Sequence, residues 1–290
     1  MDITAQAVGE GLRRANYIAN QRIETAIFLA LAIDKPLLIE GPAGAGKTEV
    51  AKVIAAMLDT ELIRLQCYEG LDEARALYEW NYQKQLLRLQ AGEHEGLAWD
   101  QVSSHLFSRD YLLERPLLRA ISSPRTVVLL IDEIDKADEE FEAFLLELLS
   151  DFQVSIPELG TVRALHHPAV VLTSNRAREL SEALRRRCLH LFIDFPTPDQ
   201  ERRIIELKVP ELDEHLAAAA ARYVAGLRKM RLRKPPSIAE TLDWARALVR
   251  LGVRELDNAA VRSTLGLLLK HDEDRVAVEG KAGNIPGSSR

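Results

Sequence analysis

The sequence contains few cysteines and no long apolar run. Its 290 residues include 2 cysteines, Cys67 and Cys188, which lie far apart and form no C-x-x-C pair. This excludes a disulfide framework or a zinc knuckle and favours a reducing compartment. The longest apolar stretches, such as 26–33 and 127–131, fall far short of the roughly 18 residues that a membrane span needs. The first residues also lack a basic-then-apolar signal pattern, so we expect a cytoplasmic protein without a transmembrane segment.

An excess of positive charge is missing as well. Lys and Arg together number 38 against 44 Asp and Glu, which gives a net charge of −6. Nucleic-acid-binding domains usually carry a basic excess, so we expect no nucleic-acid partner. Hydrophobic residues make up 47% and charged residues 28%, which is typical of a soluble globular chain and argues against a disordered or collagen-like one. The length allows one or two domains.

The first half of the sequence predicts alternating strands and helices. An apolar run at 36–40, bounded by Pro and Gly, predicts a buried strand, and 49–58 predicts a helix with one apolar face. Between them lies a Gly-rich turn. Further strands are expected at 61–67, 126–131, 169–173 and 189–193, helices at 18–33, 71–91 and 138–150, a hairpin at 152–165, and a loop with a short helix at 92–110.

The pattern changes after residue 195. Thr197 and Gln200 predict a capping box with Pro198 at the first helical position, and only helical patterns follow to about residue 271. The fold class we predict is α/β: a P-loop core with a parallel sheet between helices at 1–195, then a small all-helical lid domain at 196–274. The Gly-, Ser- and Pro-rich residues 275–290 predict a flexible tail.

The Gly-rich turn fits the pattern G-x-x-x-x-G-K-[ST] in full. Backbone N–H groups of such a turn, and the helix N-terminus after it, cradle phosphates. Lys47 would reach the β- and γ-phosphates, and Thr48 would place its hydroxyl on Mg²⁺. The alternative is a turn that merely closes a strand–helix unit. The candidate nucleotide-binding residues are Gly41, Pro42, Ala43, Gly44, Ala45, Gly46, Lys47, Thr48 and Glu49.

A pair of carboxylates follows the apolar run at 127–131. Asp132 is expected in the Mg²⁺ shell, and Glu133 is expected to polarise an attacking water as general base. The alternative is a solvated acidic turn. We interpret the carboxylates that follow as a solvated helix start; these are Asp135, Asp138, Glu139 and Glu140.

Two weaker signals come later in the chain. The strand at 169–173 ends in the polar residues 173–175, which could hydrogen-bond a γ-phosphate or a water, although such residues are common where strands stop. The run 185–187 is Arg-Arg-Arg. Arginine can stabilise charge in phosphoryl transfer across a subunit boundary, but most basic runs are solvated turns. We expect one of the three arginines to be catalytic.

Three further features of the sequence do not indicate a metal site, a nucleic-acid-binding surface or guanine specificity. His166 and His167 have no carboxylate or cysteine at metal-ligand spacing, so solvent-facing loop histidines are expected. The run 228–234 is one basic patch in an acidic chain and is expected to be a solvated face. No [NT]-K-x-D motif is present, which weakly favours adenine over guanine.

The order of these motifs resembles that of the AAA+ ATPases, over roughly residues 15–270. Within them the chain resembles the MoxR group, and most closely the CoxD-like ATPases. The segments that carry the narrower resemblance are Arg64–Asp72, Leu77–Gln83, Arg115–Arg119 and Leu172–Arg176.

The resemblance implies an ATPase that binds ATP and Mg²⁺ between the subunits of a homo-oligomeric ring, usually a hexamer. It implies a Walker A motif at 41–48, a Walker B motif at Asp132 and Glu133, and an adenine-facing segment near Tyr17 and Ile18. The catalytic residues it implies are Glu133, Lys47, the sensor 1 residue Asn175, and an arginine finger at Arg187 with Arg186 in reserve.

The chain departs from the family at one position. A sensor 2 arginine is expected at the start of a lid helix, but Ala239 stands there. Arg246, later on the same helix, is a candidate substitute.

The resemblance also implies a role and partners. MoxR-group proteins are chaperone-like ATPases that often act with a protein bearing a von Willebrand factor A domain. CoxD-like members are associated with cofactor assembly in molybdenum hydroxylases of the carbon monoxide dehydrogenase type. The aromatic segment 77–90 either contacts such a metalloenzyme client or is a packed helix anchored by Trp80 and Tyr82.

Three other functions stay open. A nucleic-acid-remodelling AAA+ motor shares this core and would respond to added DNA. A small-molecule kinase would transfer phosphate to an added acceptor rather than to water. A nucleotide-gated scaffold would show little turnover, and the missing sensor 2 arginine keeps that alternative in view.

Overall fold

The computed structural model describes residues 3–95 and 106–279 and divides into two compact units. The core unit comprises 1–15, 20–40 and 48–192. The helical unit comprises 16–19, 41–47 and 193–290.

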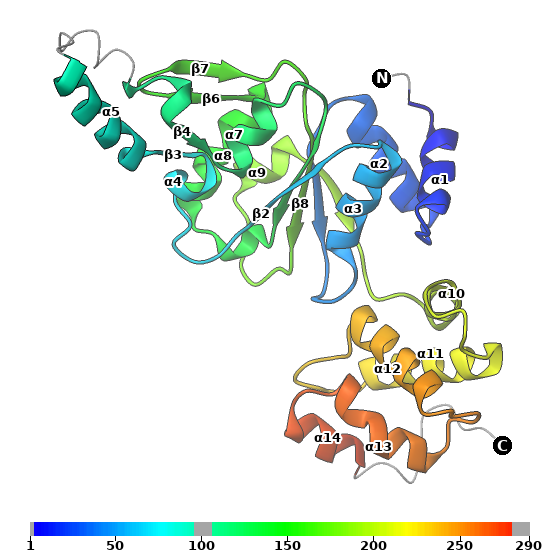
Figure 1. Cartoon of the computed structure of the whole chain (residues 1–290). Helices are drawn as coiled ribbons and strands as arrows, with labels where there is room; N and C mark the ends of the chain where they lie inside the picture. The colour runs from blue at the N-terminus through cyan, green and yellow to red at the C-terminus, as the bar shows by residue number, and fades with distance from the viewer. Residues whose placement is uncertain (1–2, 96–105, 280–290) are drawn as a thin grey trace. The chain divides into compact units, whose positions relative to one another are not determined.

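A five-stranded parallel sheet forms the centre of the core unit (Figure 1). Its strand order is β2-β5-β8-β1-β9. Strand β1 lies between β8 and β9 through long-range pairing, since Leu37 lies opposite both Val171 and Leu189. The strands are β1 Leu37–Glu40, β2 Leu62–Gln66, β5 Val128–Asp132, β8 Ala169–Ser174 and β9 Leu189–Phe192.

Helices cover both faces of this sheet, which explains why its inner strands are apolar without alternation. All five residues of β5 are buried. Leu129 and Ile131 pack into one apolar cluster with the helices that follow β4, and the helices that precede β2 lie on the other face of the sheet (Figure 1). The first group is α7 Pro116–Ile121, α8 Glu139–Asp151 and α9 Glu182–Arg187; the second is α1 Ala5–Arg14, α2 Gln21–Ala32 and α3 Lys47–Met57.

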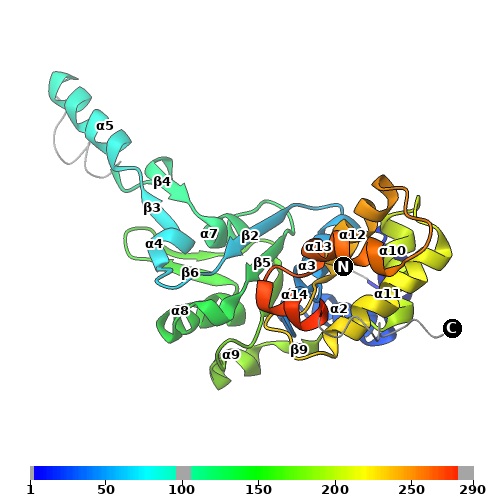
Figure 2. The ribbon, with the colours of Figure 1, turned by 90° about the horizontal axis from the view of Figure 1, so that it is seen from below.

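The segment predicted as one helix at 71–91 is broken, and that prediction is wrong. It forms α4 Glu73–Ala76, β3 Tyr78–Trp80 and α5 Tyr82–Glu95. The strand forms because Tyr78–Trp80 pairs with β4, Leu112–Glu114, in an antiparallel ladder that the sequence pattern does not reveal. In both ribbon views α5 projects away from the sheet (Figures 1 and 2).

Smaller elements complete the core unit. The expected hairpin is present as β6 Gln153–Ile156 and β7 Gly160–Arg163. Short 3₁₀ turns lie at Arg109–Tyr111 and Ile134–Lys136. The first falls in the expected loop at 92–110; residues 96–105 of that loop lie outside the described residues.

The helical unit packs five helices around Trp244, which is fully buried and donates its indole N–H to Thr264. The capping box of Thr197 and Gln200 opens the first of them. The helices are α10 Pro198–Lys208, α11 Glu214–Arg228, α12 Ile238–Arg250, α13 Asn258–Leu268 and α14 Asp272–Glu279. The predicted α/β P-loop core followed by helices is therefore confirmed.

Two predictions about the helical unit are wrong. The tail does not begin at residue 275, because α14 extends to Glu279; residues 280–290 lie outside the described residues. Nor is the run 228–234 a solvated face throughout. The Arg228 side chain is 7% exposed, is paired with Glu201, and donates to the carbonyl oxygen of Pro236 at 2.8 Å.

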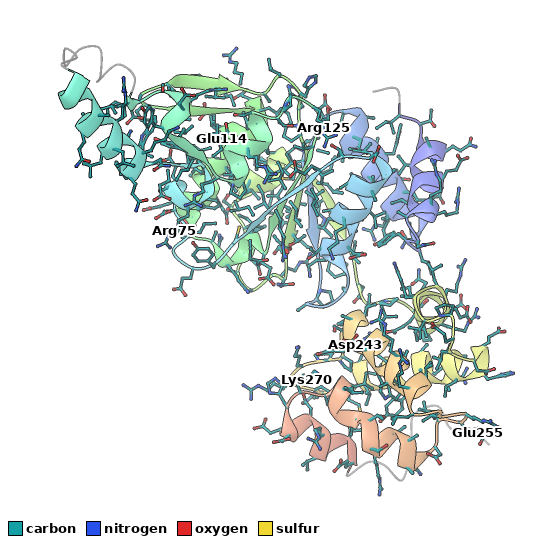
Figure 3. The ribbon with its side chains drawn as sticks, in the orientation of Figure 1. Arg75, Glu114, Arg125, Asp243, Glu255 and Lys270 are labelled. Carbon is teal, nitrogen blue, oxygen red and sulfur yellow. The ribbon has the colours of Figure 1, made fainter. Side chains whose placement is uncertain are left out.

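Charged side chains cover the outside of both units (Figure 3). Labelled there are the exposed residues Arg75, Glu114, Arg125, Asp243, Glu255 and Lys270. Over residues 3–95 and 106–279, no helix combines the length and the apolar character that crossing a membrane requires.

Candidate nucleotide-binding and active site

The Gly-rich loop joins β1 to α3 and requires glycine for a steric reason. Gly44 and Gly46 have φ angles of +81° and +87°, a backbone conformation that residues with a side chain rarely adopt. A β-carbon on Gly44 would also lie 2.3 Å from the β-carbon of Ser237 in the same unit. The carbonyl oxygen of Gly44 accepts a hydrogen bond from the Ile238 amide at 3.1 Å. The loop can therefore take this shape only with glycine at these positions.

Lys47, the first residue of α3, is buried at 6% exposure. Its Nζ donates to the carbonyl oxygens of Gly41 at 2.9 Å and Pro42 at 2.8 Å. A cation held inside a loop of backbone dipoles suits the β- and γ-phosphates of a nucleotide. This placement agrees with the role that the sequence predicts for Lys47.

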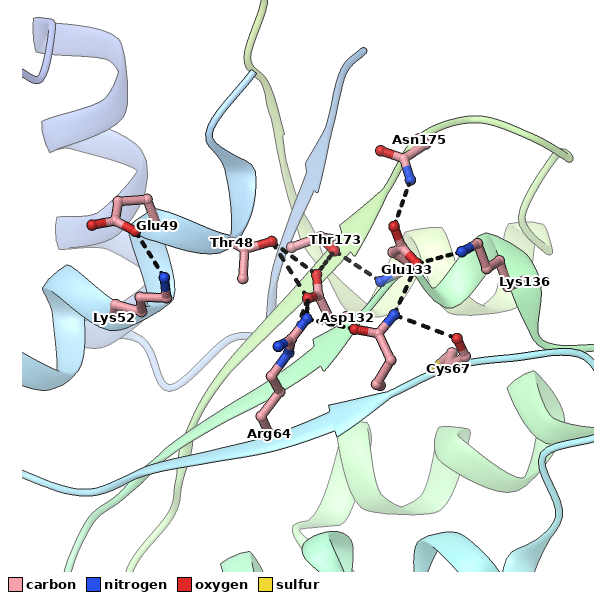
Figure 4. Close-up of polar contacts among 11 residues, drawn as sticks. Thr48, Glu49, Lys52, Arg64, Cys67, Asp132, Glu133, Lys136, Thr173 and Asn175 are labelled. Carbon is pink, nitrogen blue, oxygen red and sulfur yellow. Dashed lines mark hydrogen bonds and ion pairs between the residues drawn. The ribbon is translucent and has the colours of Figure 1, made fainter. Parts of the chain in front are cut away.

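The next residue, Thr48, belongs to a polar cluster around Asp132 at the carboxyl end of the sheet (Figure 4). Thr48 Oγ1 donates to Asp132 Oδ1 at 3.1 Å, and Thr173 Oγ1 donates to the same oxygen. The other carboxylate oxygen accepts two hydrogen bonds from Arg64, at 3.1 and 2.6 Å. A hydroxyl beside a carboxylate offers the hard oxygen ligands that Mg²⁺ prefers, so Thr48 and Asp132 fit the metal role.

Glu133 follows β5 in a left-handed conformation, with a φ of +57°. Its backbone N–H donates to Thr173 Oγ1 at 2.9 Å. Its carboxylate accepts from Gln66 at 2.8 Å and from Asn175 at 3.3 Å, and pairs with Lys136 at 2.6 Å (Figure 4). About a third of the Glu133 side chain is exposed. A carboxylate that is fixed and still reachable by water matches the predicted general base.

Asn175 lies in a short segment, residues 175–177, which we call the sensor loop. The carboxylate of Asp135 accepts the backbone N–H groups of Asn175 at 3.2 Å and Ala177 at 2.9 Å. Asp135 is 4% exposed, so its interpretation as part of a solvated helix start is wrong. The 3₁₀ turn after Glu133 directs this carboxylate inward, where it fixes the loop that carries Asn175.

The three consecutive arginines, 185–187, end α9, and we call them the arginine turn. Arg185 pairs with the buried Glu40 at 3.0 Å. Arg186 is highly exposed and pairs with Glu182 of its own helix. Arg187 donates to Ser150 Oγ at 2.5 Å and to the Ala183 carbonyl oxygen at 3.0 Å. Arg186 and Arg187 therefore do not join the cluster around Asp132, which is compatible with a target outside this unit.

Tyr17 and Ile18 are partly buried and belong to the same compact unit as the Gly-rich loop. Glu49 lies on α3 and pairs with Lys52 at 3.0 Å. Ala239 is the second residue of α12, and Arg246 of that helix pairs with Asp243 at 2.9 Å.

Within segment 77–90, Trp80 is buried and its ring lies edge-to-face against Tyr78 and Phe107. Trp80 is thus a packing anchor, whereas Tyr82 is 67% exposed.

The charges of the cluster affect two neighbours. Burial, reinforced by Asp132, Asp135 and Glu133, raises the pKa of Cys67 to about 12. The hydrogen bond and the charge of Glu133 raise the pKa of Lys136. Cys67 therefore stays a neutral thiol and Lys136 stays a cation.

Sequence reasoning missed two residues of the cluster, Arg64, which binds Asp132, and Gln66, which binds Glu133. Thr173 lies in the polar strand end singled out from the sequence, but its hydroxyl binds both Walker B residues, which was not predicted. A signal existed for Arg64 and Gln66: they alternate on a strand predicted beside the one that ends in Asp132, and parallel strands end at one edge of a sheet.

Comparison with known proteins agrees with this geometry. The model of the AAA domain (dynein-related subfamily) matches residues 36–188, which is more than half of the chain. The chain therefore belongs to the dynein-related subfamily of AAA domains. This family uses ATP and Mg²⁺, and the residues described above fit both.

The chain is also similar in sequence to curated ATPases and related proteins. The chain is 26% identical over 212 residues to the gas vesicle ATPase GvpN2 of Halobacterium salinarum, covering 70% of this chain and 58% of that protein. It is 24% identical over 213 residues to Protein NorQ of Paracoccus denitrificans, covering 71% and 70%. These matches agree with the resemblance to the MoxR group; the CoxD-like resemblance stays a prediction. The chain spans little more than half the length of GvpN2.

The fold has a solved counterpart in RuvB, the Holliday junction branch migration motor of Thermotoga maritima. The TM-score is 0.52 at 18% identity, covering 92% of this chain and 78% of that one. At this identity the match shows the fold alone.

Proposed function

We propose that the protein is an ATP-hydrolysing, chaperone-like AAA+ machine of the MoxR type that acts in the cytoplasm. The observation that carries this proposal is the cluster of Thr48, Asp132, Glu133 and Asn175 at one edge of the sheet. A metal-binding pair, a water-accessible carboxylate and an amide are the groups that hydrolysis of a nucleoside triphosphate requires.

The residues divide the work. Lys47 and the Gly-rich loop would hold the phosphates, while Thr48 and Asp132 would hold Mg²⁺. The metal ion would supply positive charge against the charge that develops on the phosphate oxygens. Glu133 accepts a proton from the attacking water, and Asn175 fixes the orientation of Glu133 through the hydrogen bond between them. Thr173 holds Asp132 and Glu133 in a constant relative position.

We further propose that the active unit is a homo-oligomeric ring, a hexamer, with ATP between subunits. The support is the placement of Arg187 and Arg186 at the end of α9, apart from the Asp132 cluster of their own chain. In this proposal Arg187 completes the site of a neighbouring subunit, with Arg186 in reserve. Tyr17 and Ile18 face the adenine.

The proposed work of the ring is to mature a metalloenzyme client of the molybdenum hydroxylase or carbon monoxide dehydrogenase type, together with a von Willebrand factor A-domain partner. The support is the CoxD-like resemblance of the segments around Arg64, Tyr78 and Arg115. Tyr82 on the projecting helix α5 is the exposed aromatic in segment 77–90 that could contact the client.

The test is the rate of ATP hydrolysis per subunit against protein concentration, with Glu133→Gln as the inactive reference. Glu140→Gln, an exposed carboxylate on α8, is the matched control and should hydrolyse like the wild type. A rate that rises steeply and then saturates supports a site completed across subunits. A flat, appreciable rate contradicts the ring, and absence of hydrolysis at every concentration contradicts the ATPase.

The same assay tests a competing function, that of a nucleic-acid motor. This alternative is kept because RuvB is found both among the solved structures with this fold and among the curated relatives. Stimulation of hydrolysis by DNA that disappears at higher salt would favour a nucleic-acid motor. We expect no stimulation, given the net charge of −6.

A further inference from the structure

Glu40, the last residue of β1, is surrounded by three basic side chains. Arg176 donates to Oε2 from Nε at 3.1 Å and from Nη2 at 2.9 Å. Arg185 donates to Oε1 at 3.0 Å, and His190 Nε2 lies 2.6 Å from Oε2. One carboxylate therefore joins three segments that are distant from it in sequence.

These segments carry functional residues. Glu40 lies opposite Ser174 of β8 and Phe192 of β9 in the sheet. Strand β8 leads directly into the sensor loop, whose middle residue is Arg176. Arg185 begins the arginine turn of α9. Glu40 is thus placed where the sensor loop and the arginine turn approach the same strand end.

The exposure of the four side chains is unequal. Glu40 is 2% exposed, whereas Arg176 is 52%, Arg185 is 40% and His190 is 38% exposed. Burial acts to raise the pKa of Glu40, but its hydrogen bonds with His190 and Arg176 and the charges of Arg185 and Arg176 outweigh burial and lower it. A buried carboxylate must keep its partners, while a half-exposed arginine can be hydrated. Glu40 is therefore the fixed anchor of the group.

The sensor loop is held on two sides. Asp135 accepts the amides of Asn175 and Ala177, and Arg176 between them extends to Glu40. Arg176 has a φ of +61° and lies over the ring of Phe192, 4.7 Å from its centre. A displacement of Asn175 is therefore transmitted to Arg176, because the loop has little freedom to absorb it.

We propose that Glu40 is a positioning residue that couples the sensor loop to the arginine turn within one chain. The proposal deepens the proposed function and rests on it for its meaning, since Asn175 contacts the general base and Arg187 acts on a neighbouring nucleotide. Through Glu40, the state of one nucleotide site sets how the same chain presents its arginine to the next.

Hydrogen exchange tests this coupling without any need for hydrolysis. Arg176→Gln removes two donors to Glu40 and leaves α9 untouched. We expect amide exchange in α9, residues 182–187, to rise roughly threefold to tenfold in this variant, as a contact shared through one carboxylate predicts. Arg119→Gln, which removes a comparably exposed arginine from its pair with Glu61, is the matched control and should leave α9 unchanged. Unchanged exchange in α9 of Arg176→Gln overturns the proposal.

A double-mutant cycle gives the second measurement. Arg176→Gln and Arg185→Gln each lower kcat at saturating ATP, and the double variant should lose less than the product of the two losses, with KM for ATP little changed. Arg176→Lys, which keeps a cationic donor, should recover most of the activity. Losses that multiply independently overturn the coupling. Absence of hydrolysis in the wild-type chain would instead contradict the proposed function and leave the exchange experiment to decide about Glu40.

Discussion

The two units each contain a carboxylate bound by an arginine, but the two pairs differ in the exposure of the arginine. In the core unit, Asp132 is 3% exposed and its partner Arg64 is 52% exposed. In the helical unit, Glu201 is fully buried and its partner Arg228 is only 7% exposed. The first arginine can leave its carboxylate for water, and the second cannot.

This difference in exposure distinguishes an ion pair in a candidate functional site from an ion pair that stabilises the fold. If Asp132 binds a metal ion, as we propose, it must release or share Arg64, and the exposure of Arg64 allows this. Arg228 also donates to the Pro236 carbonyl oxygen and stacks on the ring of Phe195. It thereby joins α10 and α11 to the residues that lead into α12. An arginine with this many buried contacts holds a fold together.

The largest effect is expected from Arg228→Met. The substitution leaves the Glu201 carboxylate buried without a partner, and the free energy of unfolding should fall by about 3–5 kcal/mol. Denaturant unfolding of the whole chain measures it. The exposed neighbour Arg231→Met is the control and should change the free energy by less than about 0.5 kcal/mol.

A smaller loss is expected when both partners of this pair are replaced. Arg228→Met with Glu201→Leu removes the uncompensated charge and puts apolar side chains in its place, so most of the stability should return, to within about 1–2 kcal/mol of wild type. The same unfolding experiment applies. A double variant as unstable as Arg228→Met alone would show that the other contacts of Arg228, with Pro236 and Phe195, stabilise the unit rather than the ion pair.

The accessible pair should contribute little to stability. Arg64→Gln is expected to change the free energy of unfolding by less than about 1 kcal/mol, because half-exposed ion pairs are weak. Since Asp132 then lacks a competing cation, the Mg²⁺ concentration at half-maximal hydrolysis should fall several-fold. A large loss of stability in this variant would contradict the expectation that Arg64, unlike Arg228, contributes little to the stability of the fold. Arg75→Gln, an exposed arginine after β2, is the control.

The smallest effect on the free energy of unfolding is expected from lowering the pH, through the carboxyl group of Glu40. The pKa of Glu40 lies below its ordinary value of 4.5, so its ionised form stabilises the folded chain above that pH, and this contribution is lost as the pH falls through the lowered pKa. The unfolding free energy of the wild type should therefore fall more steeply below about pH 4.5 than that of Glu40→Gln. Parallel slopes for the two proteins would show that the pairing does not favour the ionised carboxylate.

The sequence is sufficient for the elements that have a strong local pattern. The Gly-rich loop, the strand that ends at Asp132, and the capping box at Thr197 are all where their spacing predicts them. In each case the signal lies within a few consecutive residues, and the physical cause is local: backbone conformation, burial of an apolar run, or helix capping.

The sequence is not sufficient where a partner is distant. Trp80 lies in a strand because Leu112 is opposite to it. Asp135 is buried because the sensor loop supplies two N–H groups, and Arg228 is buried because Glu201 is 27 residues away on another helix. Local composition suggested a helix, an acidic surface and a basic surface at these three positions. Pairing across the fold determined each outcome.

The position of β1 in the sheet has a consequence for biosynthesis. Residues 37–40 leave the ribosome well before their neighbours in the sheet, which are residues 169–174 and 189–192. Neither edge of β1 can form its hydrogen bonds until those residues have also been synthesised. Contacts of such wide separation fold slowly and leave apolar strands exposed in the meantime. We propose that this protein assists the maturation of other proteins. During its own synthesis, the exposed apolar strand β1 would itself benefit from protection against aggregation until residues 189–192 have been made.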